Sequence, residues 1–596
     1  MVGADPYCPA YPQPQRVLDL ARLALERGAQ AYSARAGKTP MRRATASTNF
    51  IDDFIFSKMA ADGVEPAPLT TDAEFLRRVT LDLTGRIPTP EQAADFLNNP
   101  DGNKRLALID SLIGSGAYVD NWTLFYANLF EVTSGYYNMI SVDSRNLFYR
   151  NLRDFVQNDR SLAGLATDLI SGTGDSFTSG PLNFLVRGWQ NGDPVQDTWD
   201  TLTDRVTTRF LGAKTECISC HDGRRHLEKI NLWLTSHRRE EFWGQSAFFS
   251  RMQMTSLSLD AFNQQLHFMI VERGSGGYPS IVSPQQPGPR PSRYGGPYTP
   301  AYIFNGEQPR TGEWRRELGR IVTADRQFAR AAVNYIWAHF FSSGIVDPPD
   351  GWDLARIDPS HPPPEPWTLQ PTHPELIERL ADEFIRSNFS IQSVIRPIVQ
   401  SNAYQLSSRY PGEWKPEYAR YFAKHQPRRL SAEELYDALA TATLTLRPMF
   451  VRGFDQPVYY ASQLPDMNEP NIDPASIGTI LTNFGRGNWW NINRTTRPTV
   501  LQVLFMMNDS SIDLRTFGRS PTNLGSPEFT TRVSLLMQSN LSDTDAVKQL
   551  YLATLGRYPA DEELTVVNRQ PKPSREQWLG DIQWALLNKL DFMFNY

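Results

Sequence analysis

Two cysteines and a histidine near the middle of the chain constrain what it can fold around. They form the segment Cys217-Ile218-Ser219-Cys220-His221, in which two residues separate the thiols and the imidazole follows at once. Two thiols at this spacing on one turn can reach the two vinyl groups of a single haem, and the next residue then presents its imidazole to the iron. The segment therefore predicts one covalently attached haem c, with thioether bonds from Cys217 and Cys220 and with His221 as an axial iron ligand.

Two other kinds of site use cysteines at this spacing. A structural zinc site would take Cys217, Cys220, His226 and His237 as two thiolates and two imidazoles. The interval between these two histidines is longer than the three to five residues, roughly, that such sites use. A redox dithiol is the other alternative, but the neighbouring sequence lacks the βαβ pattern that accompanies it. We therefore favour haem over both.

The sixth iron position has two kinds of candidate ligand. His226 follows His221 by five residues, and Gly223 between them gives the backbone freedom to turn around a haem edge. Met252 and Met254 offer thioethers from a helix that we expect to end near Met254. A methionine there would also serve as core filler, and His226 would also suit a solvent or propionate contact. We take His226 as the first choice and Met254 as the second.

Basic residues flank the motif on both sides. Arg205 and Arg209 precede it, and Arg224, Arg225 and Lys229 follow it. A guanidinium group binds a carboxylate through two parallel hydrogen bonds, which suits a haem propionate. For each of these residues a solvated face is the alternative. We predict that Arg209 contacts the cofactor.

Helical patterns dominate the rest of the chain. The segments 71–74 and 431–434 each have a hydroxyl residue followed three positions later by Glu, which predicts a capped helix start. Residues 195–210 carry an apolar stripe at a spacing of three and four, directly before the cysteines. Alternation typical of strands is scarce. The fold class predicted is mainly α.

Composition divides the 596 residues into four segments. Residues 1–48 are rich in Pro, Ala and Arg and predict an irregular N-terminal arm. Residues 49–256 form a first helical domain that holds the haem motif, and the family resemblance described below implies that this domain is cytochrome-c-like. Residues 272–308 are rich in Gly and Pro and predict a linker or a long covering loop. Residues 309–596 form a second helical domain.

Covalent haem implies a compartment outside the cytoplasm. The start of the chain lacks the basic and apolar regions of a signal peptide, so we expect that a signal was removed or that translation begins further upstream. The sequence has no apolar run of about 18 residues, so we expect no transmembrane helix. The net charge of −5 gives no sign of nucleic-acid binding. Cys8 is expected to be an unpaired thiol.

The chain resembles the two-domain planctomycete-cytochrome family of unknown function over about residues 49–565. The first domain of that family is similar to segments 75–91, 210–222 and 247–249 of this chain, and the second to 315–319, 328–341, 373–376, 401–407, 497–502, 508–509 and 555–557. The resemblance implies export and haem attachment, and no established reaction. Many relatives have a second histidine where this chain has Gly223, so any role of that histidine is lost here or passes to His226.

Two later histidines suit structural roles. His339 lies on the apolar stripe of a predicted helix and is expected in the core, and His373 precedes a proline at a helix start, where it can cap. Either becomes an iron ligand only if the second domain covers the first.

Three functions remain open. We favour an exported mono-haem c-type cytochrome of the periplasm or cell envelope that transfers electrons, alone or as a subunit. A haem-containing scaffold subunit of a cell-envelope assembly is the second alternative. A peroxidase-like oxidoreductase is the third, and it would need an open distal site with acid–base groups. The expected partners are a redox protein and a larger complex, with membrane association only peripheral through partners and with no nucleic acid.

Overall fold

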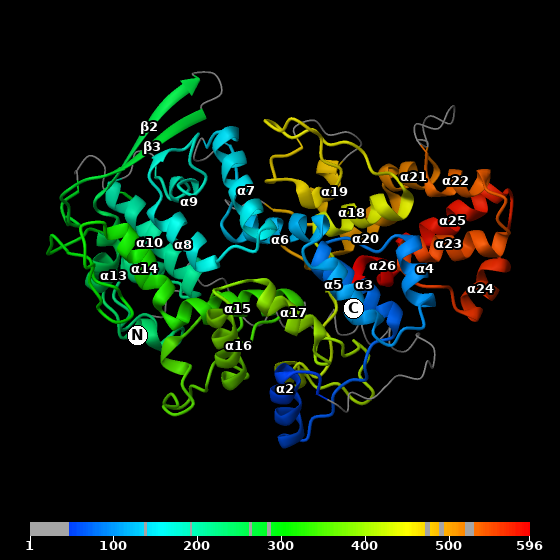
Figure 1. The fold of residues 1–596 in the computed structure, drawn as a ribbon, viewed down its shortest axis with the longest axis horizontal. Helices are drawn as coiled ribbons and strands as arrows, with labels where there is room; N and C mark the ends of the chain where they lie inside the picture. The colour runs from blue at the N-terminus through cyan, green and yellow to red at the C-terminus, as the bar shows by residue number, and fades with distance from the viewer. Residues whose placement is uncertain are drawn as a thin grey trace. The chain divides into compact units, whose positions relative to one another are not determined.

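The structure is a computed structural model that describes residues 47–135, 140–190, 194–260, 265–282, 288–470, 477–487, 494–518 and 530–596. The predicted arm at 1–48 lies outside the described residues except for its last two positions, and so does Cys8. About 52% of the chain is helical and 6% is in strands, which confirms the mainly α prediction (Figure 1). None of the described helices is long and apolar enough to cross a membrane.

The chain forms two compact units that do not follow the order of the sequence. The described part of one unit is residues 125–398, and the described part of the other combines 47–124 with 399–596. Residues 272–308 lie inside the first of these units. In the second unit, buried polar contacts join the first helices to the end of the chain.

Helix α3 (Asp72–Thr84) carries these contacts. It begins with the predicted capping box. The guanidinium of Arg78 is buried and donates to the backbone carbonyls of Tyr404 and Leu406, at 2.6 and 2.8 Å. The carboxylate of Asp82 accepts from the Asn595 amide at 2.7 Å. A buried guanidinium or carboxylate needs such partners, so the arginines and aspartate of this motif tie α3 to residues far along the chain.

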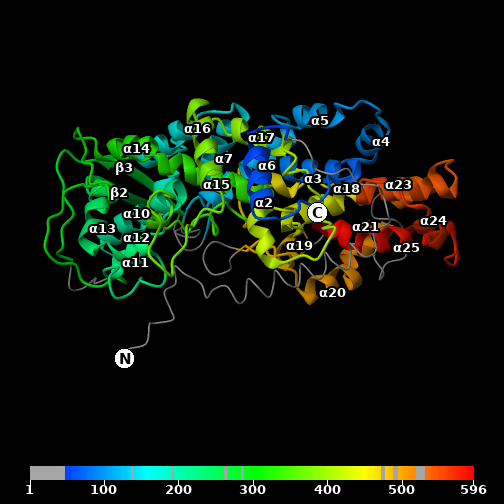
Figure 2. The same ribbon diagram turned by 90° about the horizontal axis from the view of Figure 1, so that it is seen from below.

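The unit of residues 47–124 and 399–596 is a cluster of short helices, with α4 beside α23 (Figures 1 and 2). Helix α3 contacts β5. Its helices and strands are α2 (Phe50–Ala61), α3, α4 (Pro90–Asn98), α5 (Lys104–Leu112), β4 (Arg428–Arg429), α18 (Ala432–Thr443), α19 (Ile477–Asn483), α20 (Val500–Asn508), α21 (Ser510–Phe517), α22 (Arg532–Gln538), α23 (Asp543–Leu555), α24 (Asp561–Asn568), α25 (Arg575–Leu587), α26 (Leu590–Met593) and β5 (Phe594–Asn595). The capping box predicted at 431–434 opens α18.

The unit of residues 125–398 is built around the helix that precedes the cysteines. Its elements are the end of α6 (Gly116–Leu129), α7 (Val142–Gln157), α8 (Leu162–Ser171), β1 (Gly174–Asp175), α9 (Asn183–Val186), α10 (Val195–Leu211), α11 (Glu216–Cys220), α12 (Leu232–Thr235), α13 (Arg239–Ser246), β2 (Met252–Asp260), β3 (Gln265–Glu272), α14 (Trp314–Ala324), α15 (Arg326–Phe341), α16 (Pro374–Arg386) and most of α17 (Gln392–Gln400). Helices α10, α11 and α13 pack together (Figure 2).

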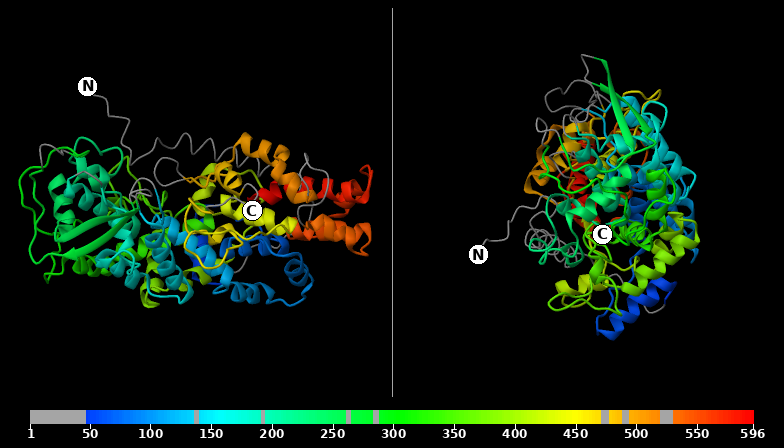
Figure 3. Two further views of the ribbon diagram at one scale, coloured as in Figure 1. Left: turned by 90° about the horizontal axis from the view of Figure 1, so that it is seen from above. Right: turned by 90° about the vertical axis from the view of Figure 1, so that its left-hand side faces the viewer.

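One expected helix is a strand. Met254 was predicted at a helix end, but residues 252–260 form β2, which pairs antiparallel with β3 in a sheet of order β1-β3-β2. The hairpin extends away from the helices of its unit (Figure 3). Met252 is buried and its neighbour Gln253 is exposed, and this alternation of buried and exposed side chains is typical of a strand.

Residues of the Gly- and Pro-rich segment contact helix α10. Arg293 is buried and forms ion pairs with Asp197 and Asp200 of α10, at 2.6 and 2.7 Å. The hydroxyl of Tyr278 donates to Asp200 at 3.0 Å.

Candidate functional site

The turn that leads into the cysteine motif can be made only by glycine. Gly212 caps α10 with φ of 67°, in the left-handed region that favours glycine. A Cβ atom at this position would lie 2.4 Å from the ring of Trp352. Because the turn is fixed in this way, the chain leaves α10 in a single direction.

Helix α11 is then attached to α10 by a buried carboxylate. Asp204 accepts a hydrogen bond from the backbone N–H of Thr215 at 3.0 Å, and the hydroxyl of Thr215 lies 2.8 Å from that of Thr207. Burial raises the pKa of Asp204. Burial, together with the charge of Asp204, also raises the pKa of Glu216. The first turn of α11 is therefore held at both its backbone and its side chains.

Helix α11 carries both cysteines and ends at the histidine. Cys217 is buried and Cys220 is half-buried. They stand at i and i+3, which places them on one face of the helix. His221 is half-buried, and its Nδ1 lies 2.9 Å from the carbonyl oxygen of Asp222. If Nδ1 carries the proton and donates to this carbonyl, Nε2 has the lone pair that a metal ligand needs. This donor set fits a haem c.

Gly223 has a different role from the one that the sequence suggested. Its N–H donates to the carbonyl of His237 at 2.9 Å. A Cβ atom on Gly223 would lie 1.8 Å from the carbonyl oxygen of Leu234 in α12. Close packing therefore requires glycine here, and the left-handed residue of this loop is Arg225, with φ of 75°.

His226 lies beside His221 and not opposite to it. The two ring centroids are 4.4 Å apart at an angle of 36°. Two imidazoles on opposite faces of one haem, each bonded at about 2 Å, have centroids about 6 Å apart. No haem plane fits between the rings as they stand, so His226 would bind iron only after its exposed side chain moves outward.

Arg209 is not brought to the cysteines. It donates to the carboxylate of Glu131 at 2.5 Å and shares that carboxylate with Arg205, which lies at 2.8 Å. Successive residues of a helix are rotated by about 100° about its axis. Arg205 and Arg209 therefore lie on a different face of α10 from Asp204 and Thr208. Met254 lies on β2, opposite Ile270.

The other sequence candidates have structural surroundings. The ring of His339 packs edge-on against Phe125 at 5.6 Å. His373 stands at the start of α16, as predicted, but its side chain makes no cap and lies 3.1 Å from the Thr372 hydroxyl. No three His, Cys, Asp or Glu side chains among the described residues gather as a metal site would require, so the zinc alternative has no assembled site there.

Two arginines that the sequence reasoning missed contact the motif directly. Arg239 donates through Nε to the carbonyl of Ser219, between the two cysteines, at 3.3 Å. Arg290 donates through Nε to the hydroxyl of the same serine at 3.2 Å. They are 20 and 71 residues from Ser219. No local pattern in the sequence marked either of them. Both guanidinium groups have further partners: Arg239 also donates to the carbonyls of Pro291 and Ser292, at 2.8 and 3.0 Å, and Arg290 forms an ion pair with Asp197 at 3.4 Å.

Comparison with known proteins identifies two family domains. Residues 50–254 match a protein family of unknown function, DUF1549, and residues 368–570 match a second one, DUF1553. No curated protein and no solved structure is detectably similar to the chain. The chain thus combines the domains of these two families of unknown function, in the order found in the planctomycete two-domain proteins.

Proposed function

We propose that the protein is an exported mono-haem c-type cytochrome that transfers electrons, alone or as a subunit of a cell-envelope assembly. The observation that carries the proposal is the presentation of Cys217, Cys220 and His221. Two thiols share one face of α11, and the imidazole that follows is hydrogen-bonded through Nδ1 to a carbonyl. This is the geometry that a thioether-linked haem and its axial ligand require.

Each residue of the site would have a defined role. Cys217 and Cys220 would form the thioether bonds, and His221 would bind iron through Nε2. The carbonyl of Asp222 would fix the tautomer and orientation of that imidazole. The bound haem would supply one-electron redox chemistry, and burial and hydrogen bonding around it would set its potential.

A scaffold function is the second candidate, supported by an exposed apolar surface. In α20 the side chains of Val500 and Leu501 are 75% and 76% exposed, and Val503, Leu504 and Met507 of the same helix are also exposed. Contiguous apolar surface of this kind is typical of partner contacts. A subunit of a larger complex, with a separate redox protein as its electron partner, would use both the cysteine motif and this apolar surface.

Haem attachment is tested on the full chain, produced with an export signal and the c-type maturation machinery. The wild type is extracted with acid acetone and run on a denaturing gel stained for haem, beside Cys217→Ala/Cys220→Ala and a matched control, Cys8→Ala. We expect the stain in the wild type and the control and its loss in the double variant. An unstained wild-type band, or stoichiometric zinc by elemental analysis, would refute the proposal.

Export is tested separately. The reading frame is extended upstream, a tag is added, and cells are fractionated. We expect the protein and its haem outside the cytoplasm. A haem-free pool confined to the cytoplasm would contradict the proposed localisation.

A further inference from the structure

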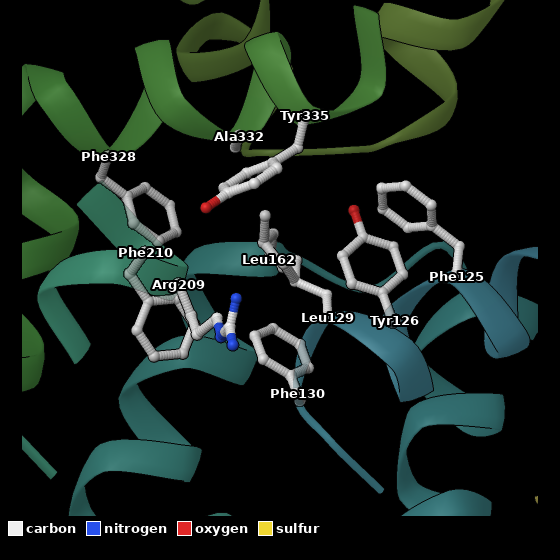
Figure 4. Close-up of a pocket in the computed structure, with 10 residues that line it drawn as sticks. All are labelled: Phe125, Tyr126, Leu129, Phe130, Leu162, Arg209, Phe210, Phe328, Ala332 and Tyr335. Atoms are coloured by element: carbon white, nitrogen blue, oxygen red, sulfur yellow. The ribbon is translucent and has the colours of Figure 1, made fainter. Parts of the chain in front are cut away.

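The aromatic pocket between α6, α10 and α15 has no room for an organic ligand. Its side chains, which include Phe130, Phe210 and Phe328, leave the space of about one water molecule (Figure 4). In the same unit, the hairpin of β2 and β3 extends away from the helices (Figures 1 and 3). This hairpin, and not the pocket, is where the unit of residues 125–398 is open to a partner.

The outer edge of β2 carries backbone groups that β3 does not pair. At the open end of the hairpin, the N–H of Arg273 donates to the carbonyl of Arg251 at 2.8 Å. Hydrogen-bonded and non-hydrogen-bonded pairs alternate along two antiparallel strands. Every second residue after Arg251 therefore bonds to β3, whereas Met254 and Ser256, which lie between these residues, direct their N–H and C=O groups to the other side.

The hydrogen bonds of β3 agree with this alternation. Phe268 lies opposite Ser256 and turns its backbone away from β2, since its N–H donates to the Ser176 hydroxyl at 3.1 Å and its carbonyl accepts from the Ser176 N–H at 2.9 Å. The strand order is β1-β3-β2, so β2 is an edge strand. In the described part of the chain, no hydrogen bond reaches the backbone of Met254 or Ser256 from the outer side.

This edge lacks the features by which proteins keep edge strands apart. Lysines, prolines and bulges usually protect an exposed edge. Residues 252–258 include no charged residue and no proline, and the bulge of β2 comes only after Ser258. The solvent-facing side of the hairpin is apolar as well, because Leu257 is 57% exposed and Met269 and Val271 of β3 are also exposed. Strand β2 thus presents an unprotected edge beside an apolar face.

We propose that β2 pairs antiparallel with β2 of a second copy of this chain. A twofold axis at the centre of the strand places Thr255 opposite Thr255 of the partner subunit. Met254 then exchanges two N–H···O bonds with Ser256 of the partner subunit.

The composition of the strand favours a second copy as the occupant of this edge. Because residues 252–258 are uncharged, pairing the strand with itself brings no like charges opposite one another, and two threonines form a stabilising cross-strand pair. The apolar faces of the two hairpins become continuous. Each copy uses its β2 edge once, so the contact closes at a dimer. The dimer does not depend on haem attachment.

The experiment is sedimentation equilibrium of the full chain at concentrations up to about 100 µM. We expect the wild type to approach twice its mass of 67.7 kDa. Thr255→Lys places two ammonium groups opposite each other, and Met254→Pro removes an outward N–H while it leaves the bonds to β3 intact. Each change occurs twice in the dimer and should raise the dissociation constant by about tenfold or more.

Cysteine cross-linking tests the register. The variants are made in a chain whose own three cysteines are replaced by Ala. Thr255→Cys should form an intermolecular disulfide on a non-reducing gel, because the Cα atoms of a non-hydrogen-bonded pair lie about 4.5 Å apart. Gln253→Cys, on the same side of the hairpin, should stay unlinked, since Gln253 would lie opposite Leu257 of the partner subunit.

Leu501→Lys is the matched control for the other exposed apolar surface, that of α20, and should leave the dimer unchanged. A wild type that remains monomeric at every concentration would overturn the proposal. A dimer that persists in both Thr255→Lys and Met254→Pro would do the same, and so would a dimer that only Leu501→Lys dissociates. A disulfide in Gln253→Cys without one in Thr255→Cys would exclude the proposed pairing.

Discussion

A buried histidine should make the stability of one unit depend on pH. His425 is 3% exposed, and neither ring nitrogen has a hydrogen-bond partner in the described part of the chain. Burial, followed by the charges of Arg78 and Arg428, holds the pKa of His425 well below its ordinary value of 6.5. The perturbation is His425→Leu, which keeps an apolar side chain of similar size and removes the titrating group.

The magnitude follows from proton binding. Below pH 6.5 the unfolded chain takes up a proton at this histidine, while the folded chain keeps it neutral. The unfolded state then binds more protons, so stability is lost as pH falls, at about 1.4 kcal/mol per pH unit. Between pH 6.5 and 5.0 the wild type should lose about 2 kcal/mol relative to His425→Leu.

The effect of His425 is the difference in the free energy of unfolding between the wild type and His425→Leu at each pH. Burial raises the pKa of Asp437 to about 7. The folded state holds that proton over the same range, which adds stability as pH falls and offsets the effect of His425 in the wild type. Subtracting the curves removes this contribution, because both proteins contain Asp437.

The assay is urea unfolding at pH 7.5, 6.5, 5.5 and 5.0, in which hydrogen exchange of peptides from α18 and α23 reports the unfolding of this unit. His361→Leu, at an exposed histidine, is the matched control and should parallel the wild type. The free energy of unfolding of His425→Leu should diverge from that of the wild type only below pH 6.5. Parallel curves down to pH 5.0 would refute the reasoning.

Three further predictions concern packing and the iron. Gly223→Ala should destabilise the protein by at least about 2 kcal/mol, because a Cβ atom there meets the Leu234 carbonyl. Gly164→Ala in α8 is the control and should change the free energy of unfolding by less than about 1 kcal/mol. Equal shifts of the melting temperature in the two variants would contradict this prediction. Arg78→Met should cost about 3 kcal/mol or more, because two buried carbonyls lose their donor, while the exposed Arg316→Met should be nearly neutral; urea midpoints decide. If the sixth ligand is His226, the ferrous wild type resists carbon monoxide and His226→Ala binds it; an unchanged optical spectrum moves the assignment to Met254, and ready binding by the wild type favours an enzyme.

Local features of the fold could be predicted, and the distant ones could not. The capping hydroxyl of Thr71 and the stripe before Leu211 are properties of a few adjacent residues, and both helices form. The contact of Arg78 with Tyr404 spans 326 residues, and no local pattern records it. For the same reason the cysteine motif could be found, but not the arginines at Ser219.

The ties of α3 to the end of the chain also set an order of events during synthesis. Arg77 donates to the carbonyl of Phe592, and Arg78 to that of Tyr596, 515 and 518 residues later. At translation rates of about 5–20 residues per second, α3 waits roughly 25 to 100 s for these acceptors. The continuous segment 125–398 has no such wait and can fold while the unit of residues 47–124 and 399–596 is still incomplete. When the ribosome releases the chain slowly, the cysteine-bearing unit therefore folds first, and the other unit is completed only when residues 592–596 have been made.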